Sequence, residues 1–423
     1  MPYNAVLPMI QIGHIAQPFS RDPQGSALPN VLDPASLPRT PVDGLYVHIP
    51  FCFHKCHYCD FYSITRQSED RMEQFVDRIL REAEFWKPSM RTNFRTVFFG
   101  GGTPTLLPMA QMRRLIGGLR DRFDFSNCLE WTVEANPATV SAEYCRMLKA
   151  AGVTRLSFGA QSFDPAELAT LERHHDPSDV PRSLSIARDA GFDRLNIDLI
   201  YAIPGQTMDG WMRNLNRAIE LGTDHISCYA LTYEPNTPMA VRLRLGQFTA
   251  TAPELEIEMM RATRRRLAEI GLHAYEISNY AKPGEECRHN LMYWRGGNYL
   301  GLGPSAASHV SGWRWKNAGN LGEWERAVDS GAVAARDVES LSKSQRAGEL
   351  AMLSLRLAEG LVYQPFSERT GYDARVIFAD VIERFRRAEL LETSQCRVRL
   401  TERGLSVADG IASEFLAAAE SIT

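Results

Sequence analysis

From Leu45 onward, short runs of β-branched and aromatic residues alternate with segments whose apolar residues recur at three- and four-residue spacing. The runs predict strands and the spaced segments predict amphipathic helices. The predicted strands are Leu45–Ile49, Thr96–Phe99, Glu130–Glu134, Arg155–Phe158, Leu195–Tyr201 and His225–Ala230. The predicted helices between and after them are Glu69–Trp86, Met109–Phe123, Ala142–Ala150, Ser178–Ala190, Gly210–Leu221 and Pro253–Ile270. This alternation predicts an α/β fold with a parallel sheet, either an open, partial (β/α)6 barrel of the TIM type or a flat doubly wound sheet.

The pattern changes on both sides of these units. The predicted organisation is an irregular Pro-rich arm over 1–43, the βα units over 44–270, extra strands with a Gly-rich loop over 271–339, and a winged-helix-like α+β domain over 340–423. The arm is either a loose tail or a strap over the active site. The last segment reads as helices, a hairpin at Leu390–Leu400 and a helix from Glu402. Because 341–423 holds 11 Lys and Arg against 12 Asp and Glu, we expect a lid or docking role instead of DNA binding.

Composition narrows the class of protein. A hydrophobic content of 44% and a charged content of 23% are typical of a soluble globular protein. The net charge of −4 argues against a general nucleic-acid binder. We find no apolar run long enough for a transmembrane segment, and no basic start followed by an apolar stretch that would predict secretion. Eight cysteines, three of them clustered, do not resemble a disulfide framework, so we expect a reducing cytoplasm.

The clustered cysteines are the strongest chemical signal of the chain. Cys52, Cys56 and Cys59 form a C-x3-C-x2-C run directly after the first predicted strand. Three thiolates can hold a cubane iron–sulfur cluster and leave its fourth iron open to a ligand. A zinc site is the alternative, with His54 or His57 as a further ligand.

Other polar and glycine residues follow later strands. The run Gly100-Gly101-Gly102-Thr103 ends the second strand, and it is either a tight turn or a place where a ligand approaches the backbone. Glu134 ends the third strand, Gln161 follows the fourth and Asp198 lies within the fifth. One such residue usually makes a structural hydrogen bond, but three at successive ends of one barrel predict a ligand site. Arg173 adds a guanidinium that fits a carboxylate in a bidentate pair, whereas we interpret His174 and His175 as ordinary loop residues.

The cysteine loop resembles that of the radical S-adenosylmethionine (SAM) superfamily, including the aromatic Tyr58 before the last cysteine. The flanking Tyr46-x-His48-Ile49-Pro50 and Asp60-Phe61 resemble the HemN/HemW branch of that superfamily. The resemblance implies a partial barrel, a [4Fe-4S] cluster on Cys52, Cys56 and Cys59, and an electron donor that reduces the cluster so that SAM is cleaved. The residues that it implies for SAM binding are Tyr46, Gly101, Gly102, Thr103, Glu134, Gln161, Arg173 and Asp198.

Two features favour the HemW-type haem chaperones over the oxygen-independent coproporphyrinogen III oxidases. The oxidases carry a fourth cysteine two residues after the third, where this chain has Phe61. The run H-N-x-x-Y-W at 289–294 resembles the HemW signature linked to haem, which implies His289 as an iron ligand and Tyr293 and Trp294 as contacts of the macrocycle. The segment 304–310 departs from the family, which usually has a run of small residues there, mostly Gly and Ala.

The sequence therefore leaves three possible functions. The first is a haem chaperone on a radical SAM scaffold, which binds haem as cargo and passes it to an acceptor protein. The second is a radical SAM enzyme that decarboxylates porphyrinogen propionates, which the absent fourth cysteine argues against. The third is a non-catalytic zinc or scaffold protein, which the matches to the SAM site argue against.

Overall fold

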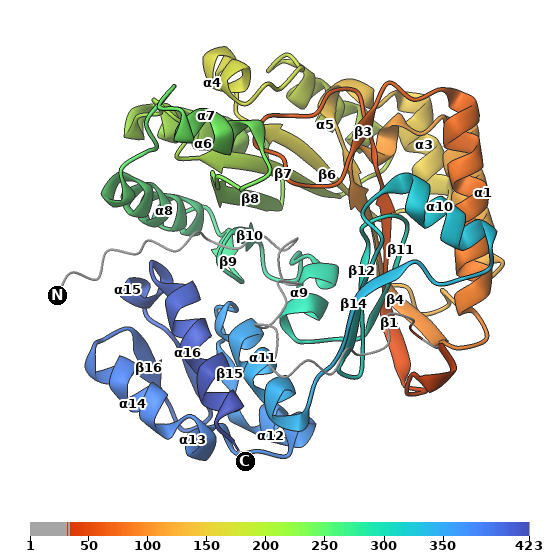
Figure 1. Ribbon diagram of the computed structural model, residues 1–423. Coiled ribbons are helices and arrows are strands. Elements are labelled where there is room, and N and C mark those ends of the chain that lie inside the picture. The colour runs from red at the N-terminus through yellow and green to blue at the C-terminus, as the bar shows by residue number, and fades with distance from the viewer. Residues whose placement is uncertain (1–31, 33, 423) are drawn as a thin grey trace.

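The computed structural model describes residues 32 and 34–422, and six parallel strands form the centre of its main sheet (Figure 1). Each of these six strands pairs with the one that follows it in chain order. They are β1 (Pro41–Ile49), β4 (Arg91–Gly101), β5 (Glu130–Ala135), β6 (Arg155–Gln161), β7 (Arg194–Tyr201) and β8 (His225–Ala230). The predicted strands are confirmed, although β1 and β4 begin four and five residues earlier than the apolar runs indicated. The prediction of an arm over residues 1–43 falls largely outside the described residues.

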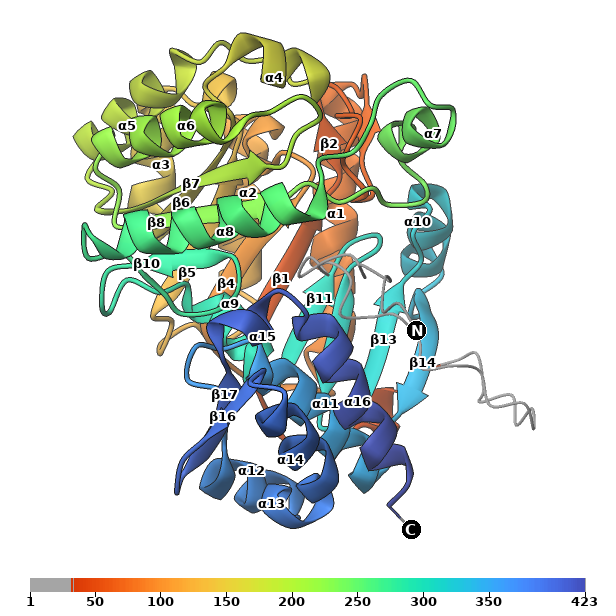
Figure 2. The same cartoon turned by 90° about the vertical axis from the view of Figure 1, so that its left-hand side faces the viewer.

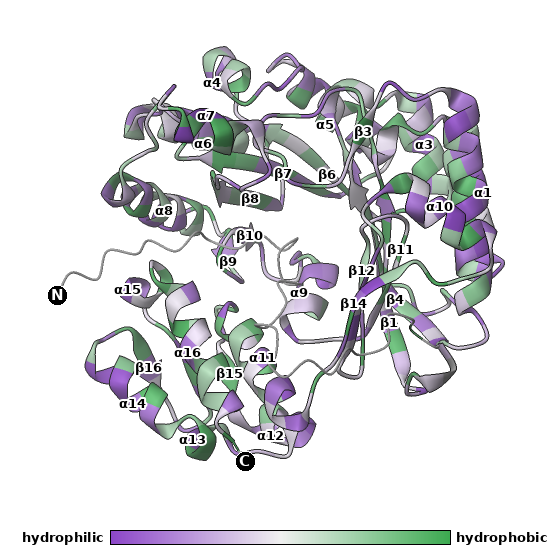
Figure 3. Cartoon of the chain, in the orientation of Figure 1, coloured by the Kyte–Doolittle hydropathy of each residue, from purple (hydrophilic) through white to green (hydrophobic). Residues whose placement is uncertain are grey.

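Helices cover the outer surface of this sheet, which curves as an open barrel (Figure 1). The helices between the strands are α1 (Glu69–Trp86), α2 (Met109–Arg120), α3 (Ala142–Ala150), α5 (Asp179–Asp189), α6 (Met208–Glu220) and α8 (Pro253–Ala268). Each agrees with its predicted range to within three residues. Side-chain caps begin several of them, such as Ser68 before α1 and Thr207 before α6. Their apolar faces turn to the strands and their polar faces to solvent (Figure 3).

The segment after α8 extends the sheet at both of its edges. The strands β9 (His273–Ala274) and β10 (Asn279–Ala281) add to β8 in antiparallel orientation. The strand β11 (Tyr299–Leu302) pairs parallel to β1. Beyond it follow β12 (Ala307–Val310), β13 (Trp313–Asn317) and β14 (Ala335–Ser340), which are antiparallel to one another. The sheet therefore has 12 strands, and the helices α9 (Arg288–Trp294) and α10 (Leu321–Asp329) belong to the same segment.

The C-terminal part has a hydrophobic core of its own, separate from that of the barrel. Figure 2 shows this part packed below α8 and α9, beside the added strands. Its helices are α11 (Lys343–Leu355), α12 (Tyr363–Thr370), α13 (Ala374–Ile377), α14 (Ala379–Arg387), α15 (Glu402–Leu405) and α16 (Ala408–Glu420). Its small sheet has β15 (Leu361–Val362), β16 (Leu391–Thr393) and β17 (Arg397–Leu400). This order agrees with the predicted helices, hairpin and final helix.

The remaining elements are short and were not predicted. They are β2 (Phe51–Cys52), β3 (Ile64–Thr65), α4 (Pro165–Thr170), α7 (Pro238–Arg244) and, over residues 34–422, three single-turn 3-10 helices, η2 (Pro34–Ser36), η3 (Pro104–Leu106) and η4 (Pro137–Thr139). The pair β2–β3 closes the loop that follows β1.

Candidate functional site

The three clustered cysteines lie in the loop at the carboxyl end of β1. Cys56 is buried, and the Cys59 N–H donates to the Cys56 carbonyl at 3.2 Å, which tightens the loop into a turn. The Thr103 hydroxyl lies 3.8 Å from the Cys52 sulfur. All eight cysteines of the chain are free thiols, so none of this trio is tied up in a disulfide.

Burial makes two of these thiols, Cys59 and Cys52, poor acids. It raises the pKa of Cys59 to about 12, with smaller contributions from the neighbouring thiolates of Cys56 and Cys52. It also raises the pKa of Cys52. Because the charges of Cys56 and Cys52 add to the raised pKa of Cys59, the three sulfurs lie close together. A bound metal would displace the thiol protons and stabilise the thiolates. The donor set of three sulfurs therefore fits an iron–sulfur cluster with one open corner.

The glycine run at the end of β4 lies directly against the start of this loop. Gly101 has a φ of +105°, and a β-carbon there would come within 2.4 Å of the His48 ring. A β-carbon on Gly102 would lie 2.7 Å from backbone atoms of the cysteine loop. The backbone N–H groups of Gly102 and Thr103 donate to Ile49 and Phe51 at 2.8 and 2.7 Å. Both glycines are thus needed for the close packing of β4 against the cysteine loop, independently of any contact with a ligand.

The structure brings the predicted carboxylates to the same end of the barrel. Glu134 accepts a bond from the Gly101 N–H at 3.2 Å. Its burial, and then the charge of Asp198, raise the pKa of Glu134 to about 8. Asp198 accepts bonds from Ser157 at 3.1 Å and from Asn196 at 2.8 Å, and burial raises its pKa too. Two carboxyl groups that influence each other in a buried place suit a polar or cationic ligand.

Arg173 lies next to the cysteine loop, and Gln161 lies with Arg173 beside Gly159. One guanidinium nitrogen of Arg173 donates to the Gly159 carbonyl at 2.6 Å, and another lies 3.7 Å from the Cys56 sulfur. The Nε of Arg173 is buried and has no hydrogen-bond partner within the described part of the chain, which leaves a donor for a bound anion. Gln161 ends β6 in the left-handed region, with φ of +66°, and its amide lies beside Gly159.

Tyr46 completes the set from β1. Its hydroxyl lies 3.1 Å from His48 Nδ1, and its ring stacks on Phe98. The structure therefore gathers the predicted residues of β1, β4, β5, β6 and β7 at one end of the sheet.

Sequence reasoning missed a second polar group inside the same barrel. Arg155 is 3% exposed, and its charge lowers the pKa of Glu134 and Asp198 against the effect of burial. The His225 ring forms hydrogen bonds through Nδ1 to Asn196 Oδ1 at 2.6 Å and through Nε2 to the Tyr275 hydroxyl at 2.9 Å. The available signal was the presence of charged and amide residues within buried strands, where apolar residues would be expected.

The H-N-x-x-Y-W run forms α9, on the concave side of the sheet. His289 is fully buried, with Nδ1 3.0 Å from the Thr96 hydroxyl and Nε2 2.9 Å from the Tyr293 hydroxyl. Burial lowers the pKa of His289 to about 3, so its imidazole is neutral. Trp294 is 2% exposed and packs on Leu353 and Leu357. In this conformation His289 and Trp294 both have partners within the protein, and their contacts with haem stay a prediction.

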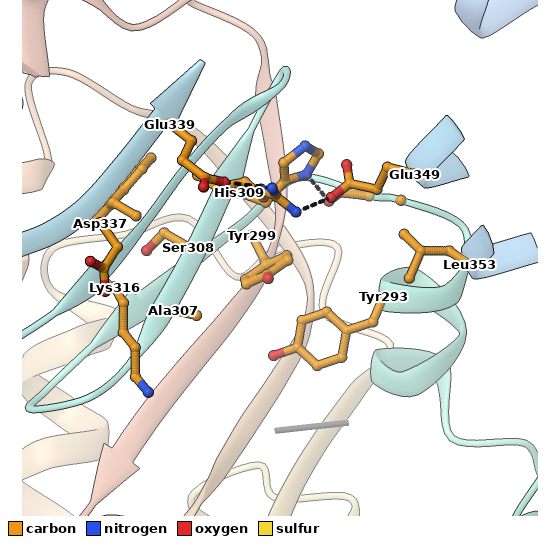
Figure 4. A pocket seen from close by; sticks show the side chains of 14 residues that line it. Tyr293, Tyr299, Ala307, Ser308, His309, Lys316, Asp337, Glu339, Glu349 and Leu353 are labelled. Carbon is orange, nitrogen blue, oxygen red and sulfur yellow. Dashed lines mark hydrogen bonds and ion pairs between the residues drawn. The ribbon is translucent and has the colours of Figure 1, made fainter. Parts of the chain in front are cut away.

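Tyr293 instead borders a cavity of about 50 Å³ between α9, the added strands and α11 (Figure 4). Tyr299 and His309 line the same cavity, and Lys316 lies at its other end. His309 Nδ1 bonds to the Gly297 carbonyl at 2.9 Å. The departure from the family over 304–310 thus falls on a wall of this cavity.

Comparisons with known proteins match most of this chain. The sequence pattern described as the radical SAM superfamily matches residues 46–218, and that of the HemN C-terminal domain matches residues 341–407. The chain is 34% identical over 377 residues to the haem chaperone HemW of Bacillus subtilis, covering 88% of this chain and 98% of that protein. It is 32% identical over 385 residues to the haem chaperone HemW of Escherichia coli, covering 90% and 99%.

Among solved structures, the coproporphyrinogen III oxidase HemN of E. coli, described as a radical SAM enzyme, matches with a TM-score of 0.78 at 24% identity. The match covers 88% of this chain and 90% of that one, and it shows a shared fold. Among the described residues, no helix combines the length and the apolar character that a membrane crossing requires.

Proposed function

Because the chain belongs to the HemW family of radical SAM proteins, we propose that it is a haem chaperone that binds a [4Fe-4S] cluster, SAM and haem. It would deliver the haem to an acceptor protein. The observation that carries the proposal is the similarity to curated HemW proteins over almost their full length. Phe61, at the position of the oxidases' fourth cysteine, supports the same choice.

The cluster would be held by Cys52, Cys56 and Cys59, and SAM by the residues at the strand ends. Arg173 has a buried, unpaired Nε beside Cys56, which suits the carboxylate of an amino acid. The buried carboxyls of Glu134 and Asp198 suit the polar groups of the nucleoside and the amino end. When bound, the reduced cluster supplies the electron that cleaves SAM, and the barrel walls exclude water from the product.

The proposed haem site is at α9. Haem would enter against Tyr293, at the cavity that this residue borders. His289 would become an iron ligand after its bond to the Tyr293 hydroxyl opens, which frees Nε2. A neutral imidazole, as burial favours here, is the form that binds iron. The free thiols favour a cytoplasmic location, where an electron donor and a haem acceptor would be met.

A hemin titration of the anaerobically reconstituted protein tests this proposal. We expect a saturable Soret shift at one haem per chain, weakened at least about tenfold in His289→Ala. His309→Ala is the matched variant, because His309 lines the same cavity but is not proposed as a ligand. Loss of binding in His309→Ala alone would move the ligand to that residue. The absence of saturable binding by the wild type would reject the chaperone, and turnover of coproporphyrinogen III would then favour the enzyme.

A further inference from the structure

A group of metal-ligating side chains lies outside the sites described so far. His54 Nε2 is 3.7 Å from Glu172 Oε2, and His174 Nε2 is 3.9 Å from the same oxygen. The three ligand atoms all lie within 4.8 Å of one another. We propose that His54, Glu172 and His174 bind a divalent transition-metal ion, with Zn²⁺ as the best fit, separately from the cysteines.

The spacing of these atoms suits such an ion. Zinc bonds of about 2.1 Å to nitrogen and oxygen in a tetrahedral site place neighbouring ligand atoms about 3.4 Å apart. Two of the three separations here, 3.7 and 3.9 Å, are a few tenths of an ångström longer than that. The side chains of His54 and Glu172 are 37% exposed and that of His174 is 53% exposed, so small rotations can close the gap.

The His54 nitrogen is already oriented for this purpose. Nε2 is shielded from solvent but has no hydrogen-bond partner among the described residues. The imidazole rings of His54 and His174 are 4.3 Å apart and nearly perpendicular, so they flank the carboxylate without stacking on each other. A buried polar atom without a partner is costly, and a bound ion would satisfy it.

The backbone holds the two ligand-bearing segments together. Glu172 adopts the left-handed conformation, with φ of +55°, in the turn after α4. The N–H of His57, in the cysteine loop, donates to the Leu171 carbonyl at 3.3 Å. The loop that carries His54 is therefore tied to the residue directly before Glu172, which limits how far the ligands can separate.

His57 is not a fourth ligand. Its Nδ1 is 4.0 Å from Glu172 Oε1, but the Arg242 guanidinium lies 3.4 Å from the same nitrogen. A cation in that position competes with a metal. Two histidines and one glutamate leave a fourth position for water, as in zinc sites that are open to a further ligand.

The ion would join two segments that the proposed cofactor site uses. His54 lies between Cys52 and Cys56, and Glu172 and His174 flank Arg173. Occupancy would therefore fix the cysteine loop relative to the guanidinium beside Cys56. The proposal thus gives His174 a role as a ligand, where the sequence alone led us to interpret it as an ordinary loop residue.

Zinc binding by the reconstituted full-length protein tests the proposal. After iron and sulfide are measured, the protein is dialysed against Zn²⁺ and its zinc content is determined by mass spectrometry. We expect one zinc per chain with a Kd of about 1 μM or tighter. His174→Ala and Glu172→Ala should each weaken binding about 10- to 100-fold. His273→Ala is the control, because His273 is an exposed histidine on β9, and its zinc content should equal that of the wild type.

X-ray absorption at the zinc edge then identifies the ligands. The proposal expects only nitrogen and oxygen neighbours at about 2.0–2.1 Å. Neighbours at about 2.3 Å would be sulfur and would assign the zinc to cysteines without a cluster, which would overturn the proposal. Absence of bound zinc, or equal binding by His174→Ala, would show that Glu172 only forms ion pairs. Because His174 is outside the proposed haem site, hemin binding by His174→Ala tests the chaperone function separately.

Discussion

At the scale of single residues, Cys56 is the least exposed of the three clustered cysteines. It is 7% exposed, and the Arg173 guanidinium lies 3.7 Å from its sulfur. We expect Cys56→Ala to abolish the cluster, because two loop thiolates remain where the open-cornered cluster needs three. Iron and sulfide content and visible absorbance after anaerobic reconstitution measure the loss. Cys396→Ala is the control, since Cys396 is exposed in the hairpin of the C-terminal part. A Cys56→Ala protein with wild-type iron and sulfide would contradict the assignment.

The sequence predicted that Glu134 and Asp198 would lie near each other, because the positions of successive parallel strands in a sheet follow from their order in the chain. The two residues come close because β5 pairs with β6 and β6 pairs with β7, in the order of the chain. The pairing of His289 could not be predicted in the same way. It depends on Thr96, 193 residues away in sequence, and on the rotamer of Tyr293. A motif can thus indicate a ligand, but it does not reveal whether the ligand's nitrogens are already bonded within the protein.

At the scale of elements, periodicity located the long helices and strands of the barrel, but not how the added strands attach. The range 271–339 was expected to hold extra strands, and the structure divides them between the two edges of one sheet. Two-residue strands such as β9 have no periodicity to detect. The placement of β9 depends on its pairing with β10, which itself pairs with β8, and these contacts form only in the folded chain.

Glu82 on α1 is one of the contacts that attach the added segment to the barrel. It is 5% exposed and accepts bonds from Gly303 at 2.8 Å, Asn317 at 2.7 Å and Trp324 at 3.1 Å. A glutamine would turn its amide N–H groups toward one of these donors. We therefore expect Glu82→Gln to lower the free energy of unfolding by about 2–3 kcal/mol, measured by urea denaturation. Glu73→Gln, on the exposed face of α1, should change it by less than about 0.5 kcal/mol.

Glu82 also makes the free energy of unfolding depend on pH. Burial raises the pKa of Glu82 to about 7 from its usual value of 4.5. The folded protein therefore holds a proton that the unfolded chain has released between these pH values. The resulting stability is complete below pH 4.5 and is lost as the pH rises to about 7. Urea midpoints across that window should fall less steeply in Glu82→Gln than in the wild type; equal slopes would contradict a protonated Glu82.

At the scale of the whole molecule, one ion-pair network joins the two hydrophobic cores. Arg314 on β13 pairs with Glu339 on β14 and with Glu349 on α11. The side chains of Arg314 and Glu349 are 12% and 8% exposed, so both charges are largely removed from water. Because Glu349 belongs to the C-terminal part, this pair couples the docking of that part to the far edge of the sheet and borders the cavity beside Tyr293.

Removing Arg314 should therefore loosen the C-terminal part from the barrel. We expect Arg314→Ala to cost about 3–5 kcal/mol, because Glu349 keeps its buried charge without this partner. Limited proteolysis between β14 and α11, together with urea denaturation, measures the effect. The double variant Arg314→Met with Glu349→Leu should recover most of the loss, since it removes both charges and fills the space. Arg384→Ala, in an exposed pair with Glu414, should change stability by less than about 1 kcal/mol. If Arg314→Ala were no more harmful than Arg384→Ala, apolar packing alone would hold the two parts together.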